Sequence, residues 1–343
     1  MIYTERRARR AGDRMTTRRR IVLALGATAL SAPLASFAQQ QTAKVARIGF
    51  LGAESASVSA SRVEALRAGL RDLGYVESKN IVIEFRWADG KYDRLPDLLV
   101  AEFVRLKVDV LVTDGTKAGL AASHASTTLP IVLGVFSDPV ALGVVASLAR
   151  PGGNITGSAT FGLELTAKRL ELLKEMLPRI TRVAVLLNPE NPIKNPLLQA
   201  MGMTAKSLKV GLQPIEARNL NEIESAFSTI SRKRVDAMVI ENETLFIANA
   251  KRIADLAAMK RIPSAGRTEF AEAGGLIGYG ANNVESFRRA AVFVDKILKG
   301  VKPGDLPIER PIKFGSVVNL KTAKALGVKI PNSLLVRATK VIE

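Results

Sequence analysis

Polar side chains that suit ligand binding follow several of the apolar segments expected to form strands. They carry hydroxyl, amide or carboxylate groups, and the candidate ligand-binding residues are Ser55, Ser57, Thr116, Ser137, Asp138, Thr160, Asn188 and Glu243. In doubly wound parallel sheets, ligands bind beyond the carboxyl ends of the strands, where loops meet helix N-termini. Hydroxyls and free N–H groups suit a ligand carboxylate, and Asp138 or Glu243 suits an ammonium group. The pattern predicts recognition of a small polar or zwitterionic ligand.

Several candidates also have a purely structural interpretation. Ser137-Asp138-Pro139 is typical of a helix N-cap followed by proline at the first helical position, which by itself explains Asp138. Asn188-Pro189 is a turn signal, and Ser55 and Ser57 are residues that ordinarily solvate a loop. Both interpretations stay open at this point.

Groups needed for catalysis or for a metal site are nearly absent. The chain has one histidine, His124, and no cysteine, so a zinc site or a Cys–His pair cannot be built. No nucleophile elbow, dinucleotide fingerprint or P-loop occurs. Carboxylate-only catalysis stays open in principle, but no spacing singles out a pair. We therefore expect a protein that is not an enzyme, with no cofactor and no metal.

Strand-like and helix-like segments alternate along the chain. The expected strands are residues 46–51, 81–87, 108–113, 131–135, 183–187, 212–217, 237–241 and 276–278. The expected helices are residues 62–73, 95–106, 117–124, 139–148, 163–177, 197–208, 223–232, 245–259 and 284–298. This alternation predicts an α/β fold with two doubly wound parallel-sheet lobes joined by a hinge.

Chain length also favours two lobes, because single cores tend to split beyond ~250–300 residues. We expect lobe 1 to comprise residues 39–157 and 283–310, and lobe 2 residues 158–282. Residues 311–343 are open to either lobe. The lobes are expected to meet at residues 152–157 and 278–282, where small residues can absorb the backbone rotation of a hinge.

The first 38 residues have the order of an export signal. Eight arginines lie between Arg6 and Arg20, an uncharged run follows from residue 21 to 38, and Ser36 and Ala38 suit cleavage after Ala38. The adjacent arginines 18–20 suggest the twin-arginine route. An uncleaved membrane anchor and a translation start at Met15 are the alternatives. The predicted location is the periplasm.

The charge does not indicate a nucleic-acid partner. The chain has 50 Lys and Arg and 32 Asp and Glu residues, and loss of residues 1–38 lowers its net charge from +18 to +12. Basic and acidic residues are interleaved, as in residues 169–174, and no dense basic tract carries stacking aromatics. We expect no nucleic-acid binding.

Short motifs along residues 47–343 carry a family resemblance. They are ALRAGL at 65–70, LGYVE at 73–77, RWADG at 86–90, YDRLP at 92–96, SDPV at 137–140, LARPGGNITG at 148–157, KRLELL at 168–173, VLLNP at 185–189, AGGL at 273–276 and NLKTAKALG at 319–327. The chain thereby resembles ABC transporter substrate-binding proteins of the tryptophan/tyrosine-binding type, which have the type I periplasmic-binding fold.

The resemblance implies a periplasmic solute receptor that closes around a small molecule and delivers it to an ABC permease in the inner membrane. An amino acid or an aromatic compound is the candidate cargo. A ligand-sensing subunit that feeds a signalling protein is the alternative. A sugar-repressor-like regulator is disfavoured, because residues 1–44 hold an arginine tract and an apolar run instead of a helix-turn-helix module. An exported hydrolase is disfavoured by the missing nucleophile–base pair.

Overall fold

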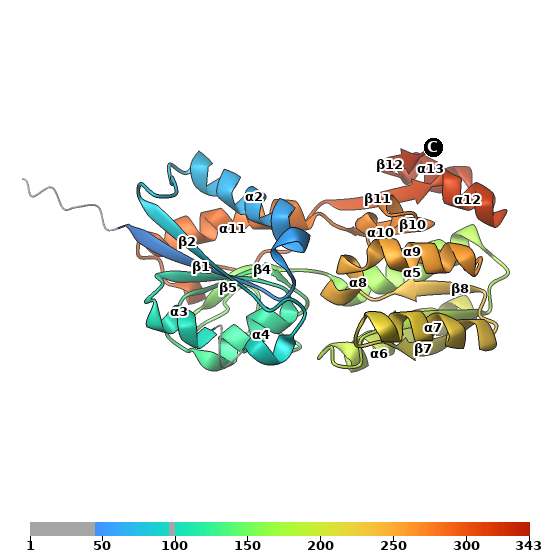
Figure 1. Ribbon diagram of the computed structural model, residues 1–343, viewed down its shortest axis with the longest axis horizontal. Helices are drawn as coiled ribbons and strands as arrows, with labels where there is room; N and C mark the ends of the chain where they lie inside the picture. Colours follow the sequence, from blue (N-terminus) through green and yellow to red (C-terminus); the bar gives the residue numbers. More distant parts are fainter. Residues whose placement is uncertain (1–44, 96–99) are drawn as a thin grey trace, which may run out of the picture. The chain divides into compact units, whose positions relative to one another are not determined.

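Helices and strands alternate along most of the computed structural model, which describes residues 45–95 and 100–343 (Figure 1). Within this part of the chain the strands form two sheets. We call each sheet with its covering helices a lobe. The α/β fold with two parallel-sheet lobes, predicted from the sequence, is confirmed. The export signal expected in residues 1–38 lies outside the described residues.

In lobe 1, five described strands form a fully parallel sheet in the order β2-β1-β3-β4-β5. Its strands are β1 (Ala46–Gly52), β2 (Ile81–Trp87), β3 (Val110–Asp114), β4 (Ile131–Phe136) and β5 (Ile155–Ala159). Its helices are α2 (Ala56–Asp72), α3 (Ala101–Arg105), α4 (Thr116–Ala125) and α11 (Asn283–Leu298), with short 3-10 turns at Tyr92–Arg94 and Pro303–Asp305.

Both faces of this sheet are covered, because its strands are apolar on both sides. All five residues of β3 are buried. Val110 and Val112 pack with α2 and α11 on one face, and Leu111 packs with α3 and α4 on the other. Figure 1 shows the two helix pairs on opposite sides of the sheet. Near-continuous burial of this kind is typical of parallel sheets and leaves polar residues to the strand ends.

The sheet of lobe 2 has seven strands among the described residues, in the order β12-β11-β10-β9-β8-β6-β7. They are β6 (Arg182–Leu187), β7 (Gly211–Glu216), β8 (Ala237–Ile240), β9 (Ser264–Gly266), β10 (Ile277–Ala281), β11 (Phe314–Asn319) and β12 (Lys340–Ile342). Neighbours are parallel except β10 and β11, which are antiparallel.

Helices again form one core on each face of the sheet of lobe 2. On one face lie α5 (Gly162–Met176), α6 (Lys194–Leu208), α12 (Leu320–Leu326) and α13 (Asn332–Arg337). On the other lie α7 (Leu220–Arg232), α8 (Thr244–Ala248), α9 (Ala250–Met259) and α10 (Thr268–Glu272).

The chain passes between the two sheets three times within the described residues. It leaves β5 for α5 through Thr160 and Phe161, and leaves β10 for α11 through Asn282. Residues 306–309 first run beside β5, where the Ala159 N–H donates to the Glu309 carbonyl at 2.9 Å, and the chain then continues to β11. Residues 314–342 therefore complete the sheet of lobe 2.

Two of the expected helices are wrong. Residues 139–148 form successive turns instead of a helix, because the Pro139 carbonyl accepts from the N–H groups of Val144 and Val145 and Gly143 has a positive φ of 68°. The helix expected over residues 245–259 is divided into α8 and α9 at Asn249, whose side chain donates to the Leu245 carbonyl at 2.8 Å. Polar side chains that bond nearby backbone compete with helix continuation.

Two glycines provide a matched test of the packing. Gly157 in β5 has φ of 126°, and a Cβ there would lie 2.3 Å from the Leu133 carbonyl oxygen of β4. Gly157→Ala should lower the free energy of unfolding by about 2–4 kcal/mol, since rigid backbone lies on the other side of the contact. Gly202 is exposed on α6, and a Cβ there would meet nothing within 4 Å. Gly202→Ala should raise the free energy by about 0.5–1 kcal/mol. Urea unfolding measures both, and a Gly157→Ala variant of native stability would contradict the strand pairing.

Candidate functional site

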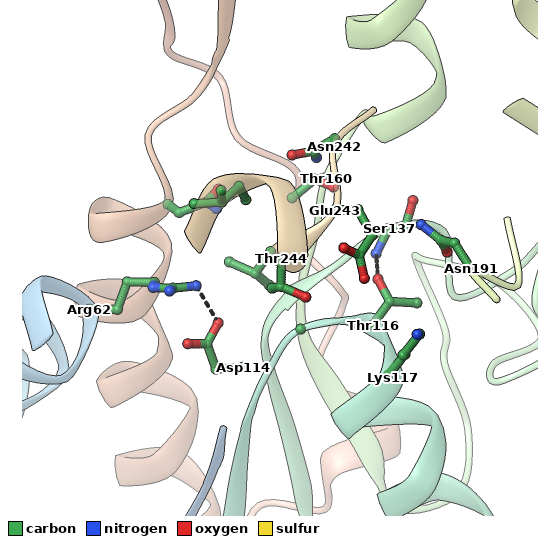
Figure 2. A pocket seen from close by; sticks show the side chains of 14 residues that line it. Arg62, Asp114, Thr116, Lys117, Ser137, Thr160, Asn191, Asn242, Glu243 and Thr244 are labelled. Carbon is green, nitrogen blue, oxygen red and sulfur yellow. Dashed lines mark hydrogen bonds and ion pairs between the residues drawn. The ribbon is translucent and has the colours of Figure 1, made fainter. Parts of the chain in front are cut away.

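One pocket is lined by residues from the strand ends of both sheets (Figure 2). From lobe 1 come the end of β3 with the start of α4, and the residues that follow β4 and β5. From lobe 2 come the loops after β6 and β8. Parallel strands all end at the same edge of a sheet, so short loops after different strands can surround a single ligand.

Four of the eight sequence-predicted residues line this pocket: Thr116, Ser137, Thr160 and Glu243. The Ser137 N–H donates to Thr116 Oγ1 at 3.1 Å, which joins the loop after β4 to the start of α4, as Figure 2 shows. The Ser137 hydroxyl oxygen is buried and has no hydrogen-bond partner among the described residues.

The other four predicted residues are not among those that line the pocket. The Ser55 and Ser57 hydroxyl oxygens lie 3.0 Å apart on the exposed start of α2. Asp138 accepts from the N–H groups of Val140 and Ala141 at 3.1 and 2.9 Å, so its carboxylate caps a turn.

Asn188 is fully buried and holds the loop after β6 together. Its N–H donates to the Glu241 carboxylate at 2.8 Å, and its side-chain oxygen accepts from the Glu190 N–H at 3.0 Å. These bonds are those of the turn that Asn188-Pro189 predicts.

A buried ion pair forms the wall that lobe 1 contributes. Arg62 Nη1 lies 2.7 Å from Asp114 Oδ1, and the Ser59 hydroxyl donates to Asp114 Oδ2 at 2.7 Å. All three side chains are buried. Gly115 follows with φ of 104°, a backbone conformation that favours glycine, and α4 begins at the next residue. Arg62 was missed from sequence because α2 is amphipathic and an arginine on it reads as a solvent-facing residue.

Two buried glutamates stand on the side of the pocket that lobe 2 contributes, where Glu243 lines the pocket and Glu241 lies two residues before it in the chain. Glu241 accepts from the Asn188 N–H and from Asn191 Nδ2, both at 2.8 Å. Glu243 Oε2 accepts from the Leu245 N–H at 2.6 Å and caps α8. Burial raises the pKa of Glu241 to about 8 and that of Glu243 to about 7, and for Glu243 the nearby Lys117 charge opposes the rise.

A third group, centred on Tyr92, connects the two walls. The Tyr92 hydroxyl donates to Glu54 in lobe 1 at 2.6 Å. The same oxygen lies 3.4 Å from both Glu243 Oε1 and Thr244 Oγ1 in lobe 2. Lys117 Nζ lies 3.6 Å from the centre of the Tyr92 ring, a cation–π contact. Neither Tyr92 nor Lys117 was singled out from the sequence, because no local pattern shows which residues a turn and a helix bring together.

Three polar atoms that line the pocket lack a hydrogen-bond partner within the described chain. They are Ser137 Oγ, Lys117 Nζ and Asn283 Oδ1, all buried. Leaving such groups unpaired costs about 1–3 kcal/mol each, and a polar ligand would remove this cost. The arrangement therefore favours binding of a solute that both accepts and donates hydrogen bonds.

Other chemistry finds no support in the described residues. No group of three or more His, Asp or Glu residues could hold a metal ion there. His124, near the end of α4, is exposed and away from the pocket lining. No helix in residues 45–95 or 100–343 is both long and apolar enough to cross a membrane.

The buried Glu241 predicts a pH dependence of stability. A glutamate in the unfolded chain ionises near pH 4.5, whereas Glu241 in the fold holds its proton until about pH 8. The protonated form is favoured by folding, so its contribution is complete below pH 4.5 and is lost as the pH rises toward 8. Between pH 5 and 8, the free energy of unfolding of Glu241→Gln should fall less than that of the wild type, by on the order of 2–4 kcal/mol.

Glu164→Gln provides the control, since it removes an exposed carboxylate of the same lobe. Urea unfolding across this pH range measures both variants. Equal pH slopes for Glu241→Gln and the wild type would show that Glu241 ionises as readily in the fold as in the unfolded chain.

The chain also matches known proteins over most of its length. The family model described as ABC transporter substrate binding protein matches residues 50–342. A tyrosine-binding protein of Clostridioides difficile (strain R20291) is 26% identical over 260 residues, which cover 75% of this chain and 74% of the relative.

Two solved structures share the fold. A conserved domain protein from Vibrio cholerae has a TM-score of 0.82 at 26% identity, covering 87% of this chain and 100% of its own. An ABC domain from Streptococcus pneumoniae in complex with L-Trp has a TM-score of 0.80 at 23% identity, covering 87% and 99%. The two-lobed architecture is the type I periplasmic-binding fold. The chain belongs to the family of ABC transporter substrate-binding proteins, which bind small-molecule cargo outside the cytoplasm and work with a membrane permease.

Proposed function

We propose that this substrate-binding protein carries an amino acid with an aromatic side chain, held in the pocket between lobe 1 and lobe 2. The observation that carries the proposal is the convergence of unpaired buried polar groups from both lobes, with the Ser137 hydroxyl foremost. The cargo class is supported by the tyrosine-binding relative and by the structure with bound L-Trp. We infer that the pocket binds without chemical turnover, since it holds carboxylates and one lysine but no nucleophile–base pair.

Four residues are proposed to contact the cargo directly: Thr116, Ser137, Thr160 and Glu243. Thr116 and Ser137 stand at the N-terminus of α4, where backbone N–H groups attract a carboxylate. We assign Ser55, Ser57, Asp138 and Asn188 to the support of loops around the pocket, on the strength of their hydrogen bonds to neighbouring residues.

We further propose that the lobes close on the cargo by rotation at the three chain passages. The domain boundaries expected from the sequence, at residues 157–158 and 282–283, lie close to the first two passages, and residues 310–313 form the third. A pocket whose two walls belong to different lobes couples occupancy to closure, and closure is what a permease can recognise.

Ser137 and Asp138 are neighbours that give a matched test of the binding site. In calorimetric titration with L-tryptophan and L-tyrosine, Ser137→Ala should weaken binding by about 0.5–1.5 kcal/mol, because it removes a buried hydroxyl that the ligand would pair. Asp138→Asn should keep the native affinity within about twofold, since asparagine retains the capping bonds.

Small-angle scattering on the same samples should show compaction at saturating ligand. A large loss of affinity in Asp138→Asn with Ser137→Ala unaffected would move the ammonium contact to Asp138. An unchanged radius of gyration at saturation would contradict closure.

We propose that residues 1–38 direct export and are removed after Ala38, with a periplasmic product. The basic tract, the uncharged run and the small residues Ser36 and Ala38 support cleavage, and the adjacent arginines 18–20 support the twin-arginine route. N-terminal sequencing of the periplasmic form should begin at or within a few residues of Gln39. Full-length protein confined to the membrane fraction would instead indicate an anchor.

A further inference from the structure

Two side chains of opposite charge line the pocket from different lobes without bonding to each other. Lys117 lies in the first turn of α4 in lobe 1, and Glu243 precedes α8 in lobe 2. Both are largely buried, and Figure 2 shows them on the same side of the pocket, near Ser137 and Asn191. Buried charges are ordinarily paired and hydrogen-bonded, so the partners of each side chain need an explanation.

Lys117 lacks a hydrogen-bond acceptor. Its ammonium group has three donors, yet its contacts in the described chain are the Tyr92 ring at 3.6 Å and the Glu190 carboxylate at 3.8 Å, and Nζ makes no hydrogen bond. Its place is also unfavourable for a cation, because the N-terminus of a helix carries partial positive charge. The Lys117 ammonium group is thus buried, lies at a helix N-terminus and lacks an acceptor. One anionic group bound to it would offset all three unfavourable features.

The surroundings of Lys117 suit a carboxylate in particular. Gly115 precedes α4, so no side chain caps the N-terminus of this helix. Ser137 is 7% exposed, and its buried hydroxyl has no partner within the described residues. A carboxylate placed between them would accept from the lysine, from the hydroxyl and from the N–H groups of the first turn.

Glu243 has the complementary deficiency. Its Oε2 accepts from the Leu245 N–H, but the nearest hydroxyl to Oε1 is that of Tyr92 at 3.4 Å. That hydroxyl donates its hydrogen to Glu54 at 2.6 Å, so its contact with Oε1 is weak, and the Asn188 side chain is the other hydrogen-bonding group near the Glu243 carboxylate. Asn283, a residue that is 7% exposed and lines the pocket, has a buried side-chain oxygen that is an unpartnered acceptor within the described residues.

The balance of charge favours a cation on this side of the pocket. Arg62 is paired with Asp114, and Arg267 with Glu269. Two further buried carboxylates stand at or behind the pocket wall, namely Glu54 and Glu243, beside Glu241, which burial keeps protonated at neutral pH. Lys117 is the cation whose charge acts on Glu243, whereas the buried Arg169 is held by the Ile240 and Tyr279 carbonyls. An ammonium group on the ligand would supply the missing positive charge.

We propose that Lys117 and Glu243 form a recognition pair for zwitterions, in which Lys117 binds the carboxylate and Glu243 the ammonium group of the cargo. This inference rests on the proposed function and refines it, since it names the charges that the cargo must carry. It also explains how closure depends on the cargo: an α-amino acid would bridge two side chains that belong to different lobes.

The proposal excludes solutes with one charge. A carboxylic acid without an amine would bind Lys117. It would leave the Glu243 carboxylate without an ammonium partner, because only apolar ligand atoms would face it. An amine without a carboxylate would leave the Lys117 ammonium buried beside a second cation. Each incomplete ligand should therefore gain affinity when the side chain that opposes it is neutralised.

The test compares L-tryptophan, indole-3-propionate and tryptamine by calorimetry on the wild type, Lys117→Met and Glu243→Gln. Both substitutions should lower the affinity for L-tryptophan by about 10–100-fold, which is the usual effect of losing a charge-assisted hydrogen bond. At the same time, Glu243→Gln should raise the affinity for indole-3-propionate, and Lys117→Met should raise the affinity for tryptamine. Lys117→Arg, which keeps the charge, should retain the wild-type order of the three ligands.

Opposite changes for different ligands cannot arise from a misfolded pocket. If Lys117→Met or Glu243→Gln lowered the affinity for all three ligands equally, the proposal would be overturned and that residue would have a structural role. Unchanged affinity for L-tryptophan would overturn it while leaving the proposed function intact. If the wild type binds neither L-tryptophan nor L-tyrosine, the proposed cargo is wrong. Thermal-shift screening would then identify the solute that does bind. If that solute lacks either charge, the proposed recognition pair is overturned, and if it carries both, the pair is supported.

Discussion

Both faces of both sheets are buried under helices, and this constraint decides where the protein can keep polar groups. Strands such as β3 have no solvent-facing side, so most of their side chains are apolar, and much of the polar lining of the pocket comes from strand ends and the residues that follow them. Because neighbouring strands run parallel, these residues gather at one edge of each sheet. The pocket is a consequence of that crowding, since it is lined from the edges of both sheets.

Crowding polar groups at buried edges requires that most of them be paired with one another. Arg62, Ser59 and Asp114 satisfy each other in lobe 1, and Glu241 is held by two donors of the loop after β6 in lobe 2. These bonds make the walls rigid before any ligand binds, which lowers the entropic cost of binding. Of the six buried side-chain atoms left without a partner within the described residues, three line the pocket: Ser137 Oγ, Lys117 Nζ and Asn283 Oδ1. A polar cargo would complete the hydrogen bonding of these three.

Glycines decide how closely the layers approach where the chain leaves a sheet. Gly157 lies against the backbone of β4 two residues before the end of β5, and Gly115 opens α4 in a conformation that favours glycine. In both places a side chain would displace an element that carries pocket residues. Their conformations are therefore part of the geometry that holds Thr116 and Ser137 together.

The sequence by itself determined the fold class, most of the elements and four of the residues that line the pocket, but the strands β5, β9, β11 and β12 were not predicted. Strong periodicity identified most of the long helices and strands, and position after a strand identified Thr116, Ser137, Thr160 and Glu243. The periodicity failed at residues 139–148, where side-chain and backbone bonds of a turn outweigh a helical pattern, and at Asn249. Only the tertiary structure brought Arg62 and Lys117 to the pocket and Tyr92 against Lys117, and only it showed which polar groups were already paired. The physical reason is range. Strand and helix periodicity depends on near neighbours in the chain, whereas the bond between Tyr92 and Glu54 and its approach to Glu243 depend on how separate elements pack.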